Sequence, residues 1–306
     1  MSLTRTNYLD YITKTWVQSD MGILLLNDSP LVNTFVSKAI YADGGIKQHA
    51  SSGSLASTLG SALTATPTAA AFDPTTSYTL GMGSTMAEIT WSAIDAAMAG
   101  SDIGKVASMQ GALQALATGV IAGFVGANSG VSNGTFQGVN YVTSFFPGSD
   151  ADIYAGASTS TSTLLGYIDR ARESLIAPGE DVIIVTSPRG RAALREAMRK
   201  GNPGSVTLTD QNFTGMPQLA YEGMPVFASD AVTSQQVSGK ANYYVVKLGS
   251  GACQLVLPTR GPITPLDVVT TKGSAVLTQN IVFQGQFWFQ NLHSAARIIS
   301  QSVTAQ

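Results

Sequence analysis

Few residues in this chain have the type and spacing of a catalytic site. It contains two histidines, His49 and His293, which lie far apart in the sequence. The segment GVSNG places Ser132 in a formal GxSxG pattern, but a serine nucleophile also needs a histidine base beside it. The pattern forms a nucleophile elbow when a strand precedes the serine and a helix follows it. Here a predicted helix precedes Ser132 and a Gly/Asn loop follows, which favours a chance match.

Signatures of cofactors and metals are equally sparse. The sequence has no GxxxxGK[ST] phosphate loop, and GMGSTM at 81–86 lacks the third glycine and the following helix of a dinucleotide fingerprint. No cluster of histidine, cysteine and carboxylate residues has metal-ligand spacing. The single cysteine, Cys253, lies in the strand-like run GACQLVLP and is expected to be a buried, inert thiol. We therefore expect no enzymatic activity, no cofactor and no metal, and keep a serine hydrolase using Ser132 as a remote alternative.

The composition favours surfaces that are buried against other molecules. Charged residues make up 12% of the 306 residues, about half of the ~25% that is usual in soluble domains. A chain with so little charge has difficulty keeping an isolated surface soluble. Contact with copies of itself would bury that surface; the alternative is a Ser/Thr-rich exterior on an ordinary monomer. The net charge of −2 gives no basic face for reading nucleic acid, so any DNA contact would be diffuse.

Neither membrane insertion nor export is expected from the sequence. The N-terminus MSLTRTNYLDYITKTW lacks the apolar core of a signal peptide. The most apolar helix candidate, GALQALATGVIAGFVG, is shorter than the ~20 apolar residues that span a bilayer. These features predict a protein made and kept in a cytoplasm.

The elements that would position any site alternate between helix and strand. Apolar residues at helical spacing predict a long helix over 102–125. VIIVTS at 182–187 is a continuous apolar run, typical of a strand buried on both faces. Pro188 suits the first turn of the helix RGRAALREAMRK that follows. With strands at 242–249 and 253–258 and a mostly β segment over 261–306, the order predicts an α+β protein.

Two segments have unusual features. Residues 41–86 carry few large apolar residues and almost no charge, which fits either a linker or a long two-stranded excursion lying on a neighbouring surface. In YEGMPVFASDAV at 221–232, Gly223 and Pro225 are expected to fix a tight turn into a buried strand, with no chemistry there. Gly223→Val is therefore expected to reduce the yield of assembly-competent subunit.

Positive charge is densest on the helix that follows Pro188. Arg189, Arg191 and Arg195 are interleaved there with other charged residues. One interpretation is a solvated helix face with i,i+4 pairs, which contribute little when exposed. The other is a set of contacts to a neighbouring subunit.

The order of these motifs resembles the major capsid proteins of tailed bacteriophages, which have the Hong Kong 97-type fold. The resemblance is carried by VIIVTSPRGRAALREAMR, YEGMPVFASDAV, NYYVVKLG and FWFQNLHSAARII, and it covers nearly the whole chain in order. It implies an N-terminal arm, an extended β-hairpin loop, a peripheral domain with a long spine helix, and an axial domain. These would lie at 1–40, at 41–90, at 91–150 with 261–306 (spine helix 102–125), and at 151–260.

The resemblance also implies a function and partners. The chain would self-assemble as pentamers and hexamers into an icosahedral shell enclosing phage double-stranded DNA, in a virion assembled in the bacterial cytoplasm. Many family members begin with a cleaved scaffolding segment that this chain has no room for. A separate scaffolding protein is therefore expected, with a sequence that is already mature as the alternative. A portal is a further expected partner, and a decoration protein is left open. Some members cross-link the loop through a lysine, for which Lys47 is the candidate; a solvated lysine is the alternative. An encapsulin-type compartment enclosing cargo protein is the alternative function.

Overall fold

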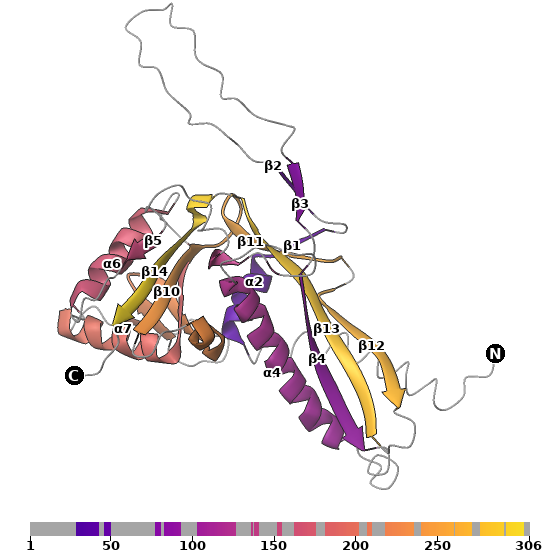
Figure 1. Cartoon of the computed structure of the whole chain (residues 1–306). Coiled ribbons are helices and arrows are strands. Elements are labelled where there is room, and N and C mark those ends of the chain that lie inside the picture. The colour runs from indigo at the N-terminus through magenta and orange to yellow at the C-terminus, as the bar shows by residue number, and fades with distance from the viewer. Residues whose placement is uncertain are drawn as a thin grey trace, which may run out of the picture.

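The computed structural model describes most of the second half of the chain and separate stretches of the first half (Figure 1). These residues contain both helices and strands, which confirms the mixed α and β class. The described residues are 29–42, 46–49, 77–80, 83–92, 103–126, 136, 138–140, 152–154, 162–175, 181–201, 207–209, 218–235, 240–259, 261–270, 276–290 and 292–302.

Among the described residues, seven strands form one sheet, called the large sheet. Its strands come from segments far apart in the sequence. For example, β14 lies between β5 and β10; it pairs in parallel with β5 and antiparallel with β10. In spatial order they are β5 (Asp152–Tyr154), β14 (Ala295–Ser302), β10 (Lys240–Lys247), β6 (Val182–Thr186), β9 (Met224–Ala228), β8 (Gln218–Tyr221) and β7 (Thr207–Thr209).

A second sheet, called the small sheet, has five strands within the described part of the chain. Its centre is β13, whose residues 276–285 pair with β4 and whose residues 286–289 pair with β11, while β12 pairs along its other edge. The strands are β1 (Ile40–Tyr41), β11 (Cys253–Leu257), β13 (Val276–Phe289), β12 (Ile263–Thr270) and β4 (Gly83–Ser92).

The helices cover these sheets on defined faces. α6 and α7 pack on each other and on the large sheet, and α4 lies along β4 and β13 of the small sheet (Figure 1). Two short 3-10 turns, η1 and η2, lie before β10 and before β14. The helical segments are α2 (Pro30–Ser37), α4 (Ile103–Val125), α6 (Ser162–Glu173), α7 (Pro188–Gly201), η1 (Asp230–Gln235) and η2 (Leu292–Ser294).

The strand β6 is buried on both faces, as its continuous apolar run predicts. Val182 and Ile184 belong to the core under α6 and α7, whereas Ile183 and Val185 belong to the core shared with α4. Because side chains alternate between the faces of a strand, β6 stands between the two cores. The predicted helix start at Pro188 is also confirmed.

A two-stranded ribbon projects away from both sheets (Figure 1). It consists of β2 (Ile46–His49) and β3 (Ser77–Leu80), which pair antiparallel from Ile46 and Leu80 to His49 and Ser77. The chain enters the ribbon after β1 and returns into β4, so both ends of the ribbon join the small sheet. Within 41–86, residues 46–49 and 77–80 thus pair as two strands, 83–86 belong to β4 of the small sheet, and 50–76 lie outside the described residues.

The helix expected over 102–125 is confirmed as α4, but it is longer than the apolar window judged from the sequence. At 23 residues, it contains a stretch, Ser108–Val125, that is long and apolar enough to cross a membrane; no other described helix is. Half of that stretch is buried inside the structure. Leu113, Leu116 and Val120 are fully buried in the core beside the small sheet, so the apolar composition is that of a core helix.

Cys253 begins β11 and is fully buried. Burial raises the pKa of its thiol, because removal from water disfavours the thiolate. Since the thiolate is the reactive form, the expected buried thiol is confirmed in a setting that keeps it protonated.

Candidate assembly surfaces

The segment 29–42, called the strap, runs from α2 into β1 and precedes the ribbon in the sequence. It begins with α2, where Ser29 caps the helix by accepting a 3.5 Å hydrogen bond from Val32 N–H, and Pro30 opens the first turn. It ends with β1, which pairs in parallel with β11, and Ala42 N–H donates to the Leu257 carbonyl at 2.9 Å. The strap is thus bound to the core at both ends.

The apolar face of α2 supplies most of the strap's anchorage. Phe35 is buried, and its ring lies 4.6 Å from that of Phe124 in α4 and 5.2 Å from that of Phe287 in β13. Phe124 and Phe287 are themselves 5.1 Å apart, centroid to centroid. Burial of a phenylalanine contributes about 1.5–3 kcal/mol and each aromatic pair about 0.5–1.5 kcal/mol more. Three rings therefore join α2, α4 and β13 into one cluster.

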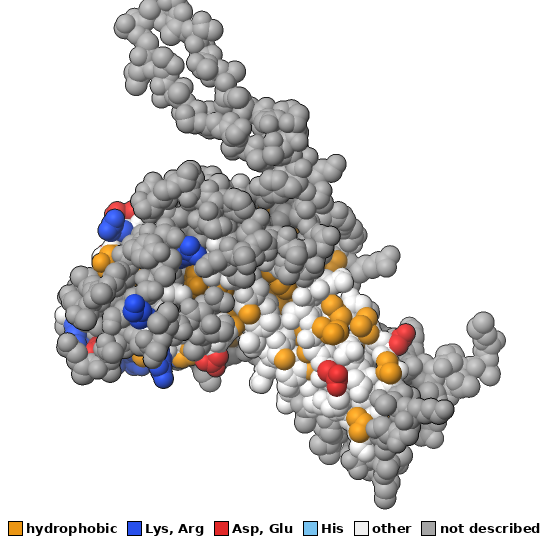
Figure 2. Space-filling model, in the orientation of Figure 1, with side chains coloured by type: hydrophobic (Ala, Val, Ile, Leu, Met, Phe, Trp, Pro, Cys, Tyr) orange, Lys and Arg blue, Asp and Glu red, His pale blue; other side chains and the backbone are white. Residues whose placement is uncertain are grey.

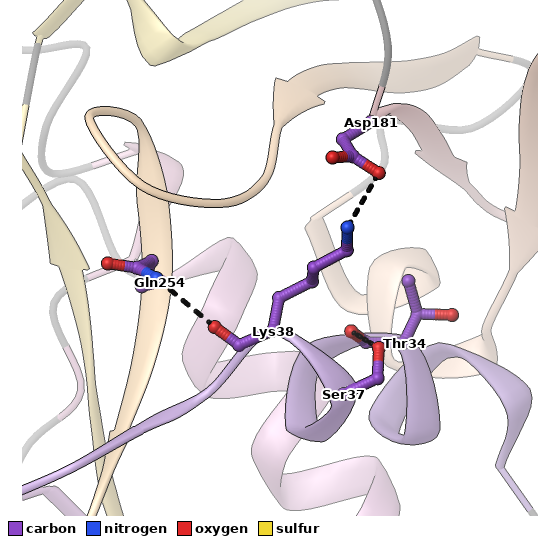
Figure 3. Close-up of polar contacts among 5 residues, drawn as sticks. All are labelled: Thr34, Ser37, Lys38, Asp181 and Gln254. Atoms are coloured by element: carbon purple, nitrogen blue, oxygen red, sulfur yellow. Dashed lines mark hydrogen bonds and ion pairs between the residues drawn. The ribbon is translucent and has the colours of Figure 1, made fainter.

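Polar contacts tie the end of α2 to both sheets (Figure 3). The Lys38 ammonium lies 2.8 Å from the carboxylate of Asp181, the residue before β6, and the Lys38 carbonyl accepts a 3.3 Å hydrogen bond from Gln254 of β11. The two charged side chains are 40% and 45% exposed, and exposed pairs contribute at most about 1 kcal/mol. The ion pair therefore orients the strap, while the aromatic cluster holds it.

The turn between β8 and β9 has the geometry that the sequence analysis expected at Gly223. Glu222 and Gly223 both have positive φ, 46° and 81°, and join Tyr221 to Met224 as a two-residue hairpin turn. Positive φ at both turn residues matches the twist of the flanking strands. No atom lies within 4 Å of the position a Gly223 side chain would occupy, so the glycine is required for its φ and not for space.

Pro225 follows in β9, where its missing N–H is tolerated. It faces Ala220 of β8, and the parallel pairing with β6 begins one residue later, at Val226. A proline at a position without a ladder donor leaves the sheet intact. Pro225 is therefore the second residue of β9, directly after the turn.

α6 holds this turn in place through side chains. Arg172 donates to the Glu222 carboxylate at 2.7 Å, and the Tyr221 hydroxyl donates to Asp169 at 2.9 Å. Burial, followed by the hydrogen bond to the Asp169 carboxylate, raises the pKa of the Tyr221 hydroxyl. Tyr221 stays a neutral donor, so these contacts are structural and supply no base.

The arginines singled out on α7 divide into two groups. Arg191 and Arg195, with Arg199, lie four residues apart along one side of α7 and line a surface cavity of about 650 Å³. Pro188, Ala192, Glu196 and Leu219 complete its lining. Arg189 is exposed but is not part of this lining. Arg199 was not among the predicted contact residues. Helical periodicity is enough to place it with Arg191 and Arg195, because residues four apart share a helix face.

The outer face of the small sheet is the second candidate surface. Along β4, Ala87 and Ile89 are buried toward α4, whereas the alternate residues, Met86 among them, point outward. Figure 2 shows hydrophobic and acidic side chains exposed together on this lobe. By strand register, its large exposed apolar side chains are Met86, Val269 and Val276, because Val269 lies opposite Thr278 and Val276 opposite Ser92.

The remaining predicted site residues are not drawn together. Lys47 lies in β2 opposite Thr79, and its side chain is outside the described ones, so the cross-linking role stays a prediction. Ser132 lies outside the described residues, after a segment that is helical up to Val125. His293 is exposed in η2. Among the described residues, no group of three or more His, Cys, Asp or Glu side chains could hold a metal ion.

Comparison with known proteins finds likeness at the level of structure. No protein-family model and no curated protein matches the sequence. The capsid of a native GTA particle matches with a TM-score of 0.60 and 14% identity, over 88% of this chain and 90% of that chain. A virus-like particle from Pyrococcus furiosus matches with a TM-score of 0.58 and 6% identity, over 94% and 99%. The SrpI encapsulin of Synechococcus elongatus PCC 7942 matches with 0.55 and 10%, over 75% and 77%.

Structures from Mycobacterium and Gordonia phages also match. The identities are far too low to carry residue roles across, but the matches cover three quarters or more of this chain. The chain therefore has the Hong Kong 97-type fold, which capsid shells and encapsulins share.

Proposed function

We propose that this chain is a major capsid protein, which assembles with copies of itself into a shell of pentamers and hexamers around phage double-stranded DNA. The observation that carries the proposal is the match to a capsid over 88% of this chain and 90% of the other. A fold alone does not fix a function. The proposal therefore also depends on surfaces of this chain that suit repeated contact with copies of itself.

Those surfaces are the strap and the outer face of the small sheet. The strap is bound to the core through α2 and β1, and the ribbon follows it in the sequence. The outer face exposes several large apolar side chains, and contiguous exposed apolar residues mark interaction sites. Contacts that repeat head to tail and close into rings would bury both features.

On this proposal the parts of the chain have the roles that the family resemblance implies. Residues 1–40 include the N-terminal arm, 41–90 the extended loop, 151–260 the axial domain, and 91–150 with 261–306 the peripheral domain. α4 is the spine helix. Two strands cross these boundaries. β4, most of which falls in the range of the extended loop, pairs with β13 of the peripheral domain along its whole length. β14, which falls in the range of the peripheral domain, lies within the large sheet.

The partners follow from the same proposal. A net charge of −2 on a chain with 12% charged residues supports contacts to packaged DNA that are few and non-specific. A separate scaffolding protein and a portal would direct assembly in the bacterial cytoplasm, and a decoration protein is a further candidate partner. The product would be the capsid of a virion.

An encapsulin-type compartment is the second candidate, favoured by the match to SrpI encapsulin with a TM-score of 0.55. Expression of the full chain, alone and with candidate scaffolding proteins from its own source, followed by negative-stain microscopy, tests the shared idea of a shell. Round particles of uniform size are expected, and a monodisperse monomer under all these conditions would overturn it. Nuclease-protected DNA in native particles supports a capsid, whereas a protein cargo supports the compartment. Hydrolysis of model esters that is lost in Ser132→Ala would instead support the hydrolase.

A further inference from the structure

The surface cavity on α7, called the α7 groove, has an unusual pattern of charge. Arg191, Arg195 and Arg199 are all exposed, and none has a carboxylate partner among the described residues. Glu196, the acidic residue of the lining, lies 2.8 Å from Lys200 instead. Like charges four residues apart destabilise a helix, so this arrangement is unfavourable in a single subunit. An anionic partner would remove the repulsion.

The residues that line the groove indicate which kind of partner it would bind. Its volume is about 650 Å³, and its apolar lining comes from Pro188, Ala192 and Leu219, with Leu219 belonging to β8. Arginine pairs well with carboxylates and phosphates, so charge alone fits either a polypeptide or DNA. Apolar side chains among arginines fit a segment with both carboxylates and apolar side chains, which the phosphate backbone of DNA does not offer. The groove therefore favours an acidic polypeptide.

A sequence of this kind includes β5, which lies at the opposite edge of the large sheet. β5 is an edge strand that pairs with β14, while the groove lies over β8, near the β7 edge. The sequence around β5 reads SDADIY, with Asp150 and Asp152 followed by Ile153 and Tyr154. Because β5 and the groove lie at opposite edges of the sheet, one copy does not bring them together, whereas two copies placed side by side can.

We propose that the α7 groove of one subunit receives the segment Asp150–Tyr154 of the neighbouring subunit, in a head-to-tail contact. Such a contact uses two different surfaces of each copy, and a rotation that closes makes it a ring. The inference rests on the proposed function, because it requires a shell built of rings. The inference names the surface that Arg191 and Arg195 would contact on the neighbouring subunit. It assigns Arg199 to the same contact and leaves Arg189 outside it.

Charge reversal tests the contact. The double variant Arg191→Glu/Arg195→Glu and the double variant Asp150→Lys/Asp152→Lys should each lower the yield of sedimenting particles by about tenfold or more, since close charge pairs at interfaces are strongly coupled. Combining all four changes should restore most of the yield, because both partners are then reversed. Circular dichroism and the thermal midpoint of each subunit establish that it still folds.

Arg189→Glu is the matched control, since it makes the same charge change on the same helix outside the groove and should leave assembly unchanged. Equal losses in the control, full assembly of the arginine variant, or failure of the fourfold variant to recover would each overturn the proposal. Normal particles that retain less nuclease-protected DNA would identify the groove as a DNA contact instead, which also overturns it. If the unmodified chain forms no particles, the proposed function fails; if it does and the variants match it, only this inference fails.

Discussion

The large sheet and the outer strands of the small sheet achieve burial in different ways. In the large sheet, β6 is buried on both faces, by α6 and α7 on one side and by the α4 core on the other. In the small sheet, α4 covers one face of β4 and β13. On this sheet Met86 is 62% exposed and Val269 58%. The first region is complete within one copy of the chain.

On the proposed function, the second region is completed by contact with a neighbouring copy of the chain. An exposed apolar side chain gains nothing from folding of the subunit, but it contributes when a neighbour removes it from water. The difference therefore separates residues that stabilise the subunit from residues that stabilise the assembly. Variants in the two groups should change different measurements.

The largest effect on the subunit is expected at the aromatic cluster. Phe287→Ala removes the ring that contacts both Phe35 and Phe124 and is itself fully buried. Truncation of a buried phenylalanine costs about 3–5 kcal/mol of unfolding free energy. Urea denaturation of the subunit measures this loss. A loss below about 1 kcal/mol would show that the strap is not packed on α4 and β13 as described.

A smaller effect is expected where α4 approaches β4. A methyl group added at Gly119 would collide with the Thr85 hydroxyl, whereas Gly111 on the same helix has open space around it. Gly119→Ala should lower the unfolding free energy by about 1–3 kcal/mol through overpacking. Gly111→Ala should raise it by up to about 1 kcal/mol, because alanine favours the helix. The prediction is contradicted if Gly119→Ala and Gly111→Ala change the unfolding free energy in the same direction.

These elements differ in how far the sequence could predict them. β6, the helix starting at Pro188 and the turn at Gly223 have local signals, since an apolar run, a proline and a glycine each restrict the backbone nearby. The pairing of β14 with β5, or of Ile40 with Val256, has no local signal, because it depends on contacts between segments far apart in the sequence. The α7 groove could not be predicted from the sequence for the same reason, because Leu219 lies beside the arginines of α7 only in the folded chain.

The turn in the large sheet gives an intermediate effect of a different origin. Gly223 has a φ of 81° and no neighbour within 4 Å of its missing side chain, so Gly223→Val should cost about 1–3 kcal/mol through backbone strain alone. Gly223→Asn should cost less, because asparagine tolerates this conformation. Comparing unfolding free energies and the yields of assembly-competent subunit of the two variants measures the strain. Equal yields for valine, asparagine and the unmodified chain would show that the turn does not depend on glycine.

The smallest effect on the subunit, and a large one on assembly, is expected on the outer face of the small sheet. Met86→Lys and Val269→Lys place a charge on exposed positions of β4 and β12, so each should change the unfolding free energy by less than about 0.5 kcal/mol. Particle yield should nevertheless fall, because a lysine buried against a neighbour loses its hydration without a partner. Ser250→Lys, at an exposed turn away from this face, is the control and should assemble normally. If both face variants assemble as well as the control, this surface faces water in the particle, and the exposed apolar residues do not distinguish the small sheet from the large one.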